Sequence, residues 1–304
     1  MTDTSLNDYP ADRVADRVYL TDAEAAEVDR LAAICNAHDR TDLKLALPRA
    51  PREVETPRAF LRRERGTLVG YASIDGLGGG EPELCGMVHP DHRLRGIGRA
   101  LLAAVLDTCR AVGDTRALLI VEDVSTCGLA FAAAAGAQLA SKEIHMELDA
   151  ADDPTALAAI GSALAGPLTV RPAAPTPADV ATLVHIMSRA FGDPEDHVRR
   201  RVEAEIRDPE GPFLIAEVGG RPVGSLKVYR MGPETGIYAL GILPADQGLG
   251  LGHQMLARAI AYVLAEGPTR FALEVDDDNE PAKALYARCG FVETTVYGYY
   301  ALDM

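Results

Sequence analysis

Apolar and polar residues in the second half of the chain alternate in ways that predict strands. The stretch 212–230, PFLIAEVGGRPVGSLKVYR, holds two apolar runs that meet at Gly219-Gly220. Two adjacent glycines suit a tight turn with positive φ, so this stretch predicts a β-hairpin. Short apolar runs at 236–243 and 270–275 predict two further strands.

Other segments carry apolar residues at the spacing of an amphipathic helix. We expect helices over 178–191, 253–265 and 280–289, and Gly290 is a suitable C′ residue for the last one. The apolar stripes of the first two helices consist of Val180, Leu183, Val184, Met187, Leu256, Ile260, Val263 and Leu264. Strands and helices therefore alternate, which predicts an α/β fold.

The two halves of the chain repeat one another at a constant offset. Pro90 matches Pro244, and the difference is 154 (244 − 90 = 154). The same offset relates Val69-Gly70 to Val223-Gly224, Gly96 to Gly250, Gly98 to Gly252, and Gly136 to Gly290. An offset kept over some seventy residues indicates the duplication of a whole domain.

The first copy opens like the second one, with a weaker pattern. A strand is predicted at 17–21, followed by a helix over 22–37 whose apolar positions are Ala26, Leu31 and Ile34. A chain of 304 residues can hold two domains of roughly 150 residues. We therefore predict an N-terminal domain at 10–150, a linker with a short helix at 151–167, and a C-terminal domain at 168–304.

Charge and composition narrow the classes of partner. A net charge of −15 argues against nucleic acid, because phosphate binding relies on Lys and Arg. The five cysteines lack the spacing of a disulfide framework or a zinc site, so no metal is expected. The chain has no signal-peptide pattern at its start and no apolar run of membrane-spanning length. We expect a cytoplasmic protein that does not bind membranes.

A glycine-rich loop follows a strand in each copy. HPDHRLRGIG occupies 89–98 and LPADQGLGLG occupies 243–252. Glycines let an anion approach backbone N–H groups closely, and the N-terminus of the following helix adds a positive dipole end. The loop therefore favours a bound pyrophosphate, although such turns also serve only to reverse the chain. The Lys-Ser/Thr ending of a P-loop and the GxGxxG spacing of dinucleotide folds are both missing.

The run Pro-x-x-Arg/Gln-x-x-Gly-x-Gly before a helix resembles the acetyl-CoA pyrophosphate loop of the GNAT N-acetyltransferase superfamily. The second copy continues at 273–291 with LEVDDDNEPAKALYARCGF, which is similar to the downstream motif of that superfamily. The resemblance covers nearly the whole chain. It implies two tandem GNAT domains, each a mixed, mostly antiparallel sheet flanked by helices, with acetyl-CoA as co-substrate.

The resemblance also implies roles for single residues of the second copy. The backbone of Leu240 and Ile242 matches the strand that pairs with the pantetheine arm in this superfamily. Asn279 matches an asparagine that contacts the cofactor arm, while as a residue before Glu-Pro it also suits a helix N-cap. The residues that match the pyrophosphate cradle are Gln247, Gly248, Gly250, Leu251 and Gly252.

Acetyl transfer to an amine requires a neutral nitrogen, stabilisation of the oxyanion and a proton for the leaving thiolate. By resemblance, Tyr286 occupies the position of the general acid near the sulfur of CoA. The alternative is a buried structural tyrosine.

The identity of the base stays open at this point. Glu274 is similar to the glutamate base of ribosomal-protein N-terminal acetyltransferases in the superfamily. Its neighbours Leu273 and Val275 point to the opposite face of a strand, so Glu274 can leave the apolar core. A structurally paired carboxylate, Glu234 as the base, and a water relay are the alternatives.

The first copy lacks these chemical groups. At the offset of 154, Ala132 replaces Tyr286, Ile120 replaces Glu274, and Ser125 replaces Asn279. A possible second CoA site remains in this copy, formed by Val88, Arg93, Arg95, Gly96 and Gly98. The first copy either binds CoA without catalysis or only shapes a substrate cleft.

The tandem layout is similar to that of the mycothiol synthases, a group in the superfamily that acetylates a small thiol-sugar amine in its second domain. The chain departs from that group in two ways: it has no tryptophan, and Gly236 stands where a glutamate is expected.

The sequence thus predicts an N-acetyltransferase whose C-terminal copy acts on a small-molecule or peptide amine. The alternative is a non-catalytic CoA-binding or regulatory protein. Early helices and final strands form the acceptor pocket in the superfamily, where this chain offers Asp193, Glu195, Asp196, Tyr297, Tyr299 and Tyr300. We expect either a monomer, as an internal pseudo-dimer, or a homodimer.

Overall fold

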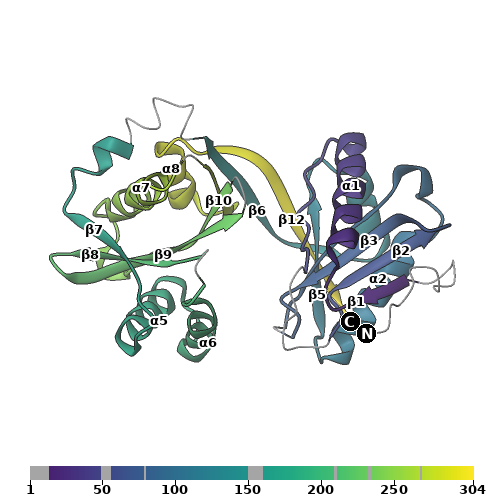
Figure 1. Cartoon of the computed structure of the whole chain (residues 1–304), viewed down its shortest axis with the longest axis horizontal. Coiled ribbons are helices and arrows are strands. Elements are labelled where there is room, and N and C mark those ends of the chain that lie inside the picture. Colours follow the sequence, from purple (N-terminus) through teal and green to yellow (C-terminus); the bar gives the residue numbers. More distant parts are fainter. Residues whose placement is uncertain are drawn as a thin grey trace. The chain divides into compact units, whose positions relative to one another are not determined.

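The computed structural model describes residues 14–48, 56–78, 80–149, 160–208, 211–231, 234–267 and 269–304. The chain divides into two compact units, each of which contains an α/β sheet with helices (Figure 1). Unit 1 consists of Met1–Glu143 and Thr295–Met304, and unit 2 consists of Ile144–Thr294.

Unit 1 is built on a sheet with helices on both faces. Its strands follow the order β1-β2-β3-β4-β5, with β12 beside β5 and β6 beside β12. β4 and β5 pair in parallel, whereas β1 with β2, β2 with β3, β3 with β4, and β5 with β12 pair antiparallel. The elements are β1 (Val14–Arg17), α1 (Asp22–Asp39), β2 (Ala59–Glu64), β3 (Thr67–Asp75), β4 (Glu83–Val88), a 3-10 turn (Pro90–His92), α2 (Ile97–Ala111), β5 (Arg116–Glu122), α3 (Thr126–Ala134) and β6 (Gln138–Asp149).

The apolar core of unit 1 is split by the sheet into two clusters. One cluster gathers the buried side of α1 with Leu61, Tyr71 and Met87. The other gathers α2 and α3 with Phe60 and Leu84 from the opposite face. Neighbouring strand residues such as Phe60 and Leu61 thus pack on opposite sides, as the strand period requires.

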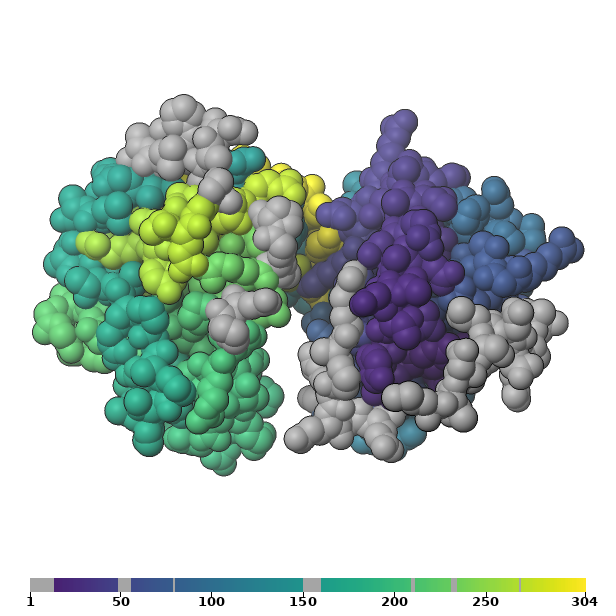
Figure 2. Space-filling view, in the orientation of Figure 1, coloured from purple at the N-terminus to yellow at the C-terminus, as the bar shows by residue number. Residues whose placement is uncertain are grey.

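Unit 2 repeats this plan. Its strands follow the order β6-β11-β10-β9-β8-β7, and α5 with α6 covers one face while α7 with α8 covers the other (Figure 1). The elements are β7 (Leu168–Pro172), α5 (Pro177–Phe191), α6 (Glu195–Glu205), β8 (Phe213–Val218), β9 (Arg221–Met231), β10 (Glu234–Ile242), a 3-10 turn (Pro244–Asp246), α7 (Leu251–Leu264), β11 (Arg270–Asp276), α8 (Glu280–Arg288) and β12 (Val292–Asp303). The α7 and α8 segment, yellow-green in Figure 2, lies at the surface of unit 2.

The last strands of the two copies are exchanged. β6 and β12 are both twelve residues long and match at the offset of 154 (292 − 138 = 154). β6 begins in unit 1 and ends in unit 2, whereas β12 begins in unit 2 and ends in unit 1. Each sheet is thus completed by the last strand of the other copy, an exchange of one repeated element that has the form of domain swapping.

The two units therefore differ from the domains 10–150 and 168–304 at their ends. Ile144–Asp149, with its buried Ile144, Met146 and Leu148, belongs to unit 2. Of the predicted linker at 151–167, residues 151–159 lie outside the described residues, and 160–163 are helical.

Most of the element predictions for the second copy are confirmed. Gly219 and Gly220 have φ values of 59° and 79° between the antiparallel strands β8 and β9, as a primed hairpin turn requires. Val180, Leu183, Val184 and Met187 are buried on α5. The sequence missed α6, whose short buried stripe consists of Val198 and Val202.

The predictions for the start of the first copy are partly wrong. The strand is at Val14–Arg17 rather than 17–21. On α1, Leu31 is buried as predicted, but Ala26 is exposed and Ile34 is 45% exposed. The buried stripe instead includes small residues, Ala25 and Cys35, which give a weak apolar signal in the sequence.

Candidate active site

A wedge opens between the parallel strands β10 and β11. Their register covers only Glu234–Gly236 with Arg270–Ala272, although both strands continue beyond it. A bulge interrupts the pairing of β10 with β9 between Tyr238 and Gly241, and Ala239 has a φ of 50° there. Such bulges re-aim a strand and are common beside active sites. Leu240 and Ile242, the residues expected along the cofactor arm, lie on β10 past the point of separation.

The glycine loop of the second copy connects β10 to α7. The side-chain amide of Gln247 donates to the carbonyl of Ile242 at 3.0 Å, which ties the loop to the end of the strand. Gly248 and Gly250 have φ values of 77° and 74°, and a Cβ at either position would meet no atom within 4 Å. The glycines thus provide both the left-handed turns and an open backbone surface.

The N-terminus of α7 is left without a side-chain cap. Helices α1, α3, α5 and α8 are each capped by an oxygen of their N-cap residue, whereas the N-cap of α7 is Gly250. The first N–H groups of a helix have no intrahelical partner and attract anions. In the same turn, the buried Nε2 of His253 makes no hydrogen bond within the described residues. These groups fit a pyrophosphate and its substituents.

Helix α8 packs close behind this loop. A Cβ on Gly252 would come within 2.8 Å of Cδ1 of Leu285, so the helices approach closely only because residue 252 is glycine. The next residue along α8, Tyr286, is 8% exposed, and its ring lies 6.1 Å from that of Phe291. The loop and Tyr286 are therefore brought together by the packing of α7 on α8.

Burial fixes the protonation of Tyr286. Desolvation raises the pKa of its phenol to about 12, so the hydroxyl keeps its proton at neutral pH. Within the part of the chain that the structure describes, this hydroxyl makes no hydrogen bond. A protonated hydroxyl without a protein partner can donate to a ligand.

Asn279 is the N-cap of α8. Its side-chain oxygen accepts from the N–H of Ala282 at 3.2 Å, and the residue is exposed. The structural interpretation of Asn279 as a cap is thus confirmed, and its contact with the cofactor stays a prediction.

Glu274 lies on β11, two residues past Ala272, the last residue paired with β10. Leu273 and Val275 on either side are buried, while the Glu274 side chain is 26% exposed. Its Oε1 lies 3.9 Å from Nδ1 of His145, a residue of β6. The sequence did not single out His145, because it lies in the first copy and reaches unit 2 only through the exchanged strand.

The glycine loop of the first copy keeps the same geometry. Nε of Arg93 donates to the carbonyl of Val88 at 3.0 Å, which repeats the bond between Gln247 and Ile242 at the offset of 154. Gly96 is an uncapped N-cap with a φ of 84°, and a Cβ on Gly98 would meet Phe131 at 3.2 Å. The two copies therefore share one loop conformation.

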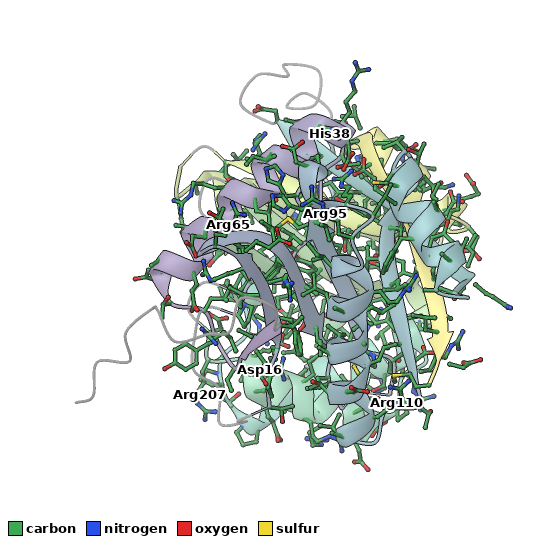
Figure 3. All side chains as sticks on the ribbon, turned by 90° about the vertical axis from the view of Figure 1, so that its right-hand side faces the viewer. Asp16, His38, Arg65, Arg95, Arg110 and Arg207 are labelled. Atoms are coloured by element: carbon green, nitrogen blue, oxygen red, sulfur yellow. The ribbon has the colours of Figure 1, made fainter. Side chains whose placement is uncertain are left out.

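The arginines in the glycine loop of the first copy already have partners within the protein. Arg93 makes a bidentate ion pair with Asp39 at 2.8 and 2.6 Å, which lowers the pKa of that carboxyl to about 2. Arg95 donates to the carbonyl of Asp91. Figure 3 labels Arg95, which precedes the N-cap of α2, and Arg110 in the last turn of the same helix. Arg93 is thus held by Asp39 rather than offered to a phosphate.

Unit 1 also differs from unit 2 beside its parallel strands β4 and β5. A cavity of about 130 Å³ there is lined by Lys44, Glu83, Cys85 and Ile120. Nζ of Lys44 donates to the hydroxyl of Tyr299 at 2.7 Å. The side-chain amine of Lys44 therefore lies beside β4 and β5. The matching strands of unit 2, β10 and β11, are those that would face the acceptor.

The three tyrosines offered for the acceptor pocket belong to unit 1. Tyr299 donates to Glu143, and Tyr297 donates to the carbonyl of Asp42 at 2.7 Å. Tyr300 also lies in unit 1 and packs against the α2 cluster. Their assignment to an acceptor pocket in the second copy is wrong, because β12 leaves unit 2 before residue 297.

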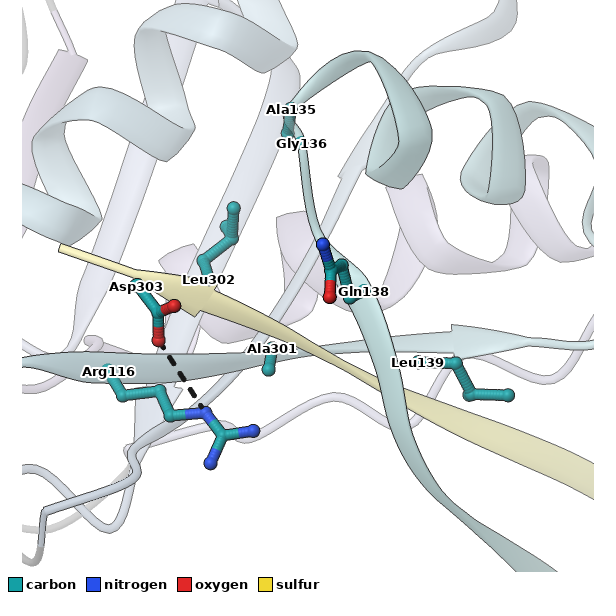
Figure 4. Close-up of a pocket in the computed structure, with 8 residues that line it drawn as sticks. All are labelled: Arg116, Ala135, Gly136, Gln138, Leu139, Ala301, Leu302 and Asp303. Carbon is teal, nitrogen blue, oxygen red and sulfur yellow. Dashed lines mark ion pairs between the residues drawn. The ribbon is translucent and has the colours of Figure 1, made fainter.

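A larger pocket of unit 1, about 280 Å³, is lined by the start of β5, the residues after α3, the start of β6 and the end of β12 (Figure 4). Its charged residues, Arg116 and Asp303, approach each other to 3.9 Å. None of its lining residues belongs to a glycine loop. The described residues contain no cluster suited to a metal ion and no helix with the length and hydropathy of a membrane span.

Comparison with known proteins identifies relatives over most of the chain. Residues 25–133 and 180–291 match the model of the acetyltransferase (GNAT) family. A mycothiol acetyltransferase of Thermomonospora curvata is 32% identical over 91% of this chain and 93% of its own. A mycothiol acetyltransferase of Kineococcus radiotolerans is 38% identical over 76% and 77%, respectively.

Solved structures share the tandem fold. A GCN5-related N-acetyltransferase from Sphaerobacter thermophilus aligns with a TM-score of 0.75 at 20% identity, covering 96% of each chain. A tandem GNAT protein from the clavulanic acid biosynthesis pathway aligns with a TM-score of 0.70 at 19% identity, covering 96% of this chain and 98% of its own.

Proposed function

Because the chain belongs to the acetyltransferase (GNAT) family, we propose that its second copy, within unit 2, transfers an acetyl group from acetyl-CoA to a primary amine. The observation that carries this proposal is the phenol of Tyr286, which is buried, protonated and without a hydrogen bond among the described residues, behind the glycine loop. Ala132, its counterpart in the first copy, has no proton to give. The chain is an acyltransferase by family, and the asymmetry of the two copies points to unit 2.

The glycine loop of unit 2 would hold the pyrophosphate of acetyl-CoA. Gln247, Gly248 and Gly250 shape the loop, and the backbone N–H groups at the start of α7, from Leu251 and Gly252, supply donors. Leu240 and Ile242 on β10 would run along the pantetheine arm, with Asn279 near it. Acetyl-CoA, when bound, supplies the activated acetyl group.

The chemistry needs one proton donor and one proton acceptor. Tyr286 would give its proton to the departing sulfur, for which a phenol that stays protonated at neutral pH is suited. Glu274, at the opening of the wedge, would help to remove the proton of the amine. Glu234 starts β10 at the other end of the β10–β11 pairing, opposite Arg270, and is the second carboxylate candidate.

The acceptor that the relatives favour is the amine used by mycothiol acetyltransferases. One feature of the site argues against assigning that amine to this chain directly. A Cβ on Gly236 would lie 2.4 Å from Cε2 of Tyr238, so the Tyr238 ring fills the space where the relatives' group is expected to carry a glutamate. The proposal is therefore a primary amine, with the mycothiol acetyltransferase acceptor as the first candidate and a peptide amine as the second.

Unit 1 would take the supporting role. Its loop, with Val88, Arg93, Arg95, Gly96 and Gly98, retains the fold of a CoA site, and its Arg93 is held by Asp39. We propose that unit 1 does not transfer acetyl groups. The alternative of a chain that only binds CoA has less support, because relatives along most of the chain are named acetyltransferases.

The proposal is tested by an acceptor panel. Purified protein is incubated with acetyl-CoA and each of four amines: the acceptor of mycothiol acetyltransferases, glucosamine, a peptide with a free N-terminus, and a lysine peptide with a blocked N-terminus. Mass spectrometry detects the acetylated product. Transfer to at least one amine is expected, and the ranking identifies the substrate class. Absence of product with all four amines contradicts the proposed function.

A further inference from the structure

His145 belongs to the first copy by sequence, but it lies in unit 2, close to Glu274. It is the eighth residue of β6, in the half of the strand that belongs to unit 2 (145 − 138 + 1 = 8). Nδ1 of its ring lies 3.9 Å from Oε1 of Glu274, and Nε2 lies 3.5 Å from Oε1 of Glu147. The side chain is 18% exposed, so solvent and small molecules can still reach it.

Three carboxylates act on this imidazole. Glu274 faces it from β11, Glu147 follows it on β6, and Glu234 acts on it from β10. On β12 the neighbour is the uncharged Thr294, whose hydroxyl donates to the carbonyl of His145. The interaction with Glu274 is the largest cause that raises the pKa of His145 above 6.5; burial opposes it, and Glu147 and Glu234 add to the rise. The imidazole thus becomes a stronger base than a free histidine.

The equivalent position in unit 1 has lost this arrangement. At the offset of 154, Tyr299 takes the place of His145 and Ile120 takes the place of Glu274. Tyr299 is engaged by Lys44 and Glu143. The pair of His145 and Glu274 therefore accompanies Tyr286, and all three are present only in unit 2.

Resting on the proposed function, we propose that His145 is the general base of unit 2 and that Glu274 is its charge partner. The amine gives its proton to the imidazole as its nitrogen forms a bond with the carbonyl carbon of the thioester. The carbon–sulfur bond then breaks, and the thiolate takes the proton of Tyr286. The tyrosinate and the imidazolium return to their resting states by proton exchange through solvent. Glu274 stabilises the imidazolium while it exists.

This arrangement also accounts for Gly236. The carboxylate expected on β10 is absent, and the ring of Tyr238 occupies its space. β6 lies beside β11 on the side away from β10. A base on β6 would reach the site from the other side of β11 and would take over the task of that carboxylate. The exchanged strand thereby becomes a requirement for chemistry as well as for folding.

The pH dependence of kcat/KM separates His145 from Glu274 as the base. For the best acceptor of the panel, the wild-type rate should rise with pH through the raised pKa of His145, because only the neutral imidazole accepts a proton. His145→Gln should remove this limb and lower kcat/KM by roughly 10²–10⁴-fold. Glu274→Gln should keep the limb but shift it to lower pH, since the largest cause of the raised pKa is gone. Glu147→Gln should shift it in the same direction by less.

The matched control is His185→Gln. His185 lies exposed on α5 and has no role in the site, so its variant should keep the wild-type profile. An NMR titration of the His145 ring in the free protein gives a readout that does not depend on turnover. It should show a pKa above 6.5 that falls in Glu274→Gln.

The outcomes distinguish this inference from the function on which it rests. If the wild type acetylates no amine of the panel, the proposed function fails. If the wild type is active but Glu274→Gln removes the limb while His145→Gln only shifts it, Glu274 is the base and the inference is overturned. It is overturned equally if His145→Gln keeps the wild-type profile.

Discussion

Removing the hydroxyl of either of two buried tyrosines, Tyr286 and Tyr71, should have opposite effects on stability and activity. Tyr286 in unit 2 has a hydroxyl without a hydrogen bond in the described part of the chain, whereas the hydroxyl of Tyr71 in unit 1 donates to the carbonyl of Ala46 at 2.8 Å. Removing a hydroxyl whose partner stays buried costs about 1–3 kcal/mol, while removing one that has no partner costs little or nothing. Removing a general acid lowers the rate by roughly 10²–10⁴-fold.

Tyr286→Phe should therefore keep the free energy of unfolding within about 0.5 kcal/mol of wild type and lose most of kcat. Tyr71→Phe should lower the free energy of unfolding by about 1–3 kcal/mol and leave kcat unchanged. Urea denaturation followed by circular dichroism measures the first quantity, and product formation measured at saturating acetyl-CoA gives the second. A Tyr286→Phe variant that is destabilised like Tyr71→Phe and keeps its kcat would refute the assignment of Tyr286 as the acid.

Two further predictions concern the ion pair of unit 1 and the exchanged strands. The lowering of the Asp39 pKa from 3.8 to about 2 corresponds to about 2 kcal/mol of stability, present above pH 4 and lost as the pH falls toward 2. Asp39→Asn should lower the free energy of unfolding by about that amount at pH 7 and by about half of it at pH 3; an equal gap at both pH values in urea titrations would disprove the linkage. A fragment of residues 168–304 lacks the three buried side chains of Ile144–Asp149, a loss of about 5 kcal/mol that rivals the stability of a domain. It should not form a folded monomer by circular dichroism and gel filtration, and co-expression with residues 1–149 should restore a folded complex; a stable, active monomeric fragment would rule out the exchange.

The repeated glycine loops were predictable because their physics is local. A few consecutive residues determine the positive φ of Gly248 and Gly250 and the uncapped start of α7. The α5 stripe and the hairpin turn at Gly219-Gly220 could be predicted for the same reason. Each depends on a short period or a short turn, and no distant residue is needed to decide it.

The features that the sequence missed depend on distant residues. His145 and Glu274 are 129 positions apart (274 − 145 = 129), and only the exchange of β6 brings them together. An offset of 154 relates each residue to its copy but does not say which sheet a repeated strand will join. Tyr297 and Tyr299 were misassigned for that reason. The ion pair between Arg93 and Asp39 could not be predicted either, because the sequence does not show which charged residues lie close together in the fold.

The central claim is that unit 2, and not unit 1, carries out acetyl transfer. Gly250 and Gly96 offer a matched test, because both are N-cap glycines with similar positive φ, and a Cβ at either would meet no atom within 4 Å. A glutamate at either position carries the same backbone strain and places a negative charge where a pyrophosphate would bind.

The decisive measurement is kcat/KM for acetyl-CoA in Gly250→Glu and Gly96→Glu, with the best acceptor of the panel. Gly250→Glu should lower kcat/KM by at least roughly 100-fold, which corresponds to about 3 kcal/mol, while Gly96→Glu stays within about twofold of wild type. A loss of transfer in Gly96→Glu with wild-type rates in Gly250→Glu would contradict the account.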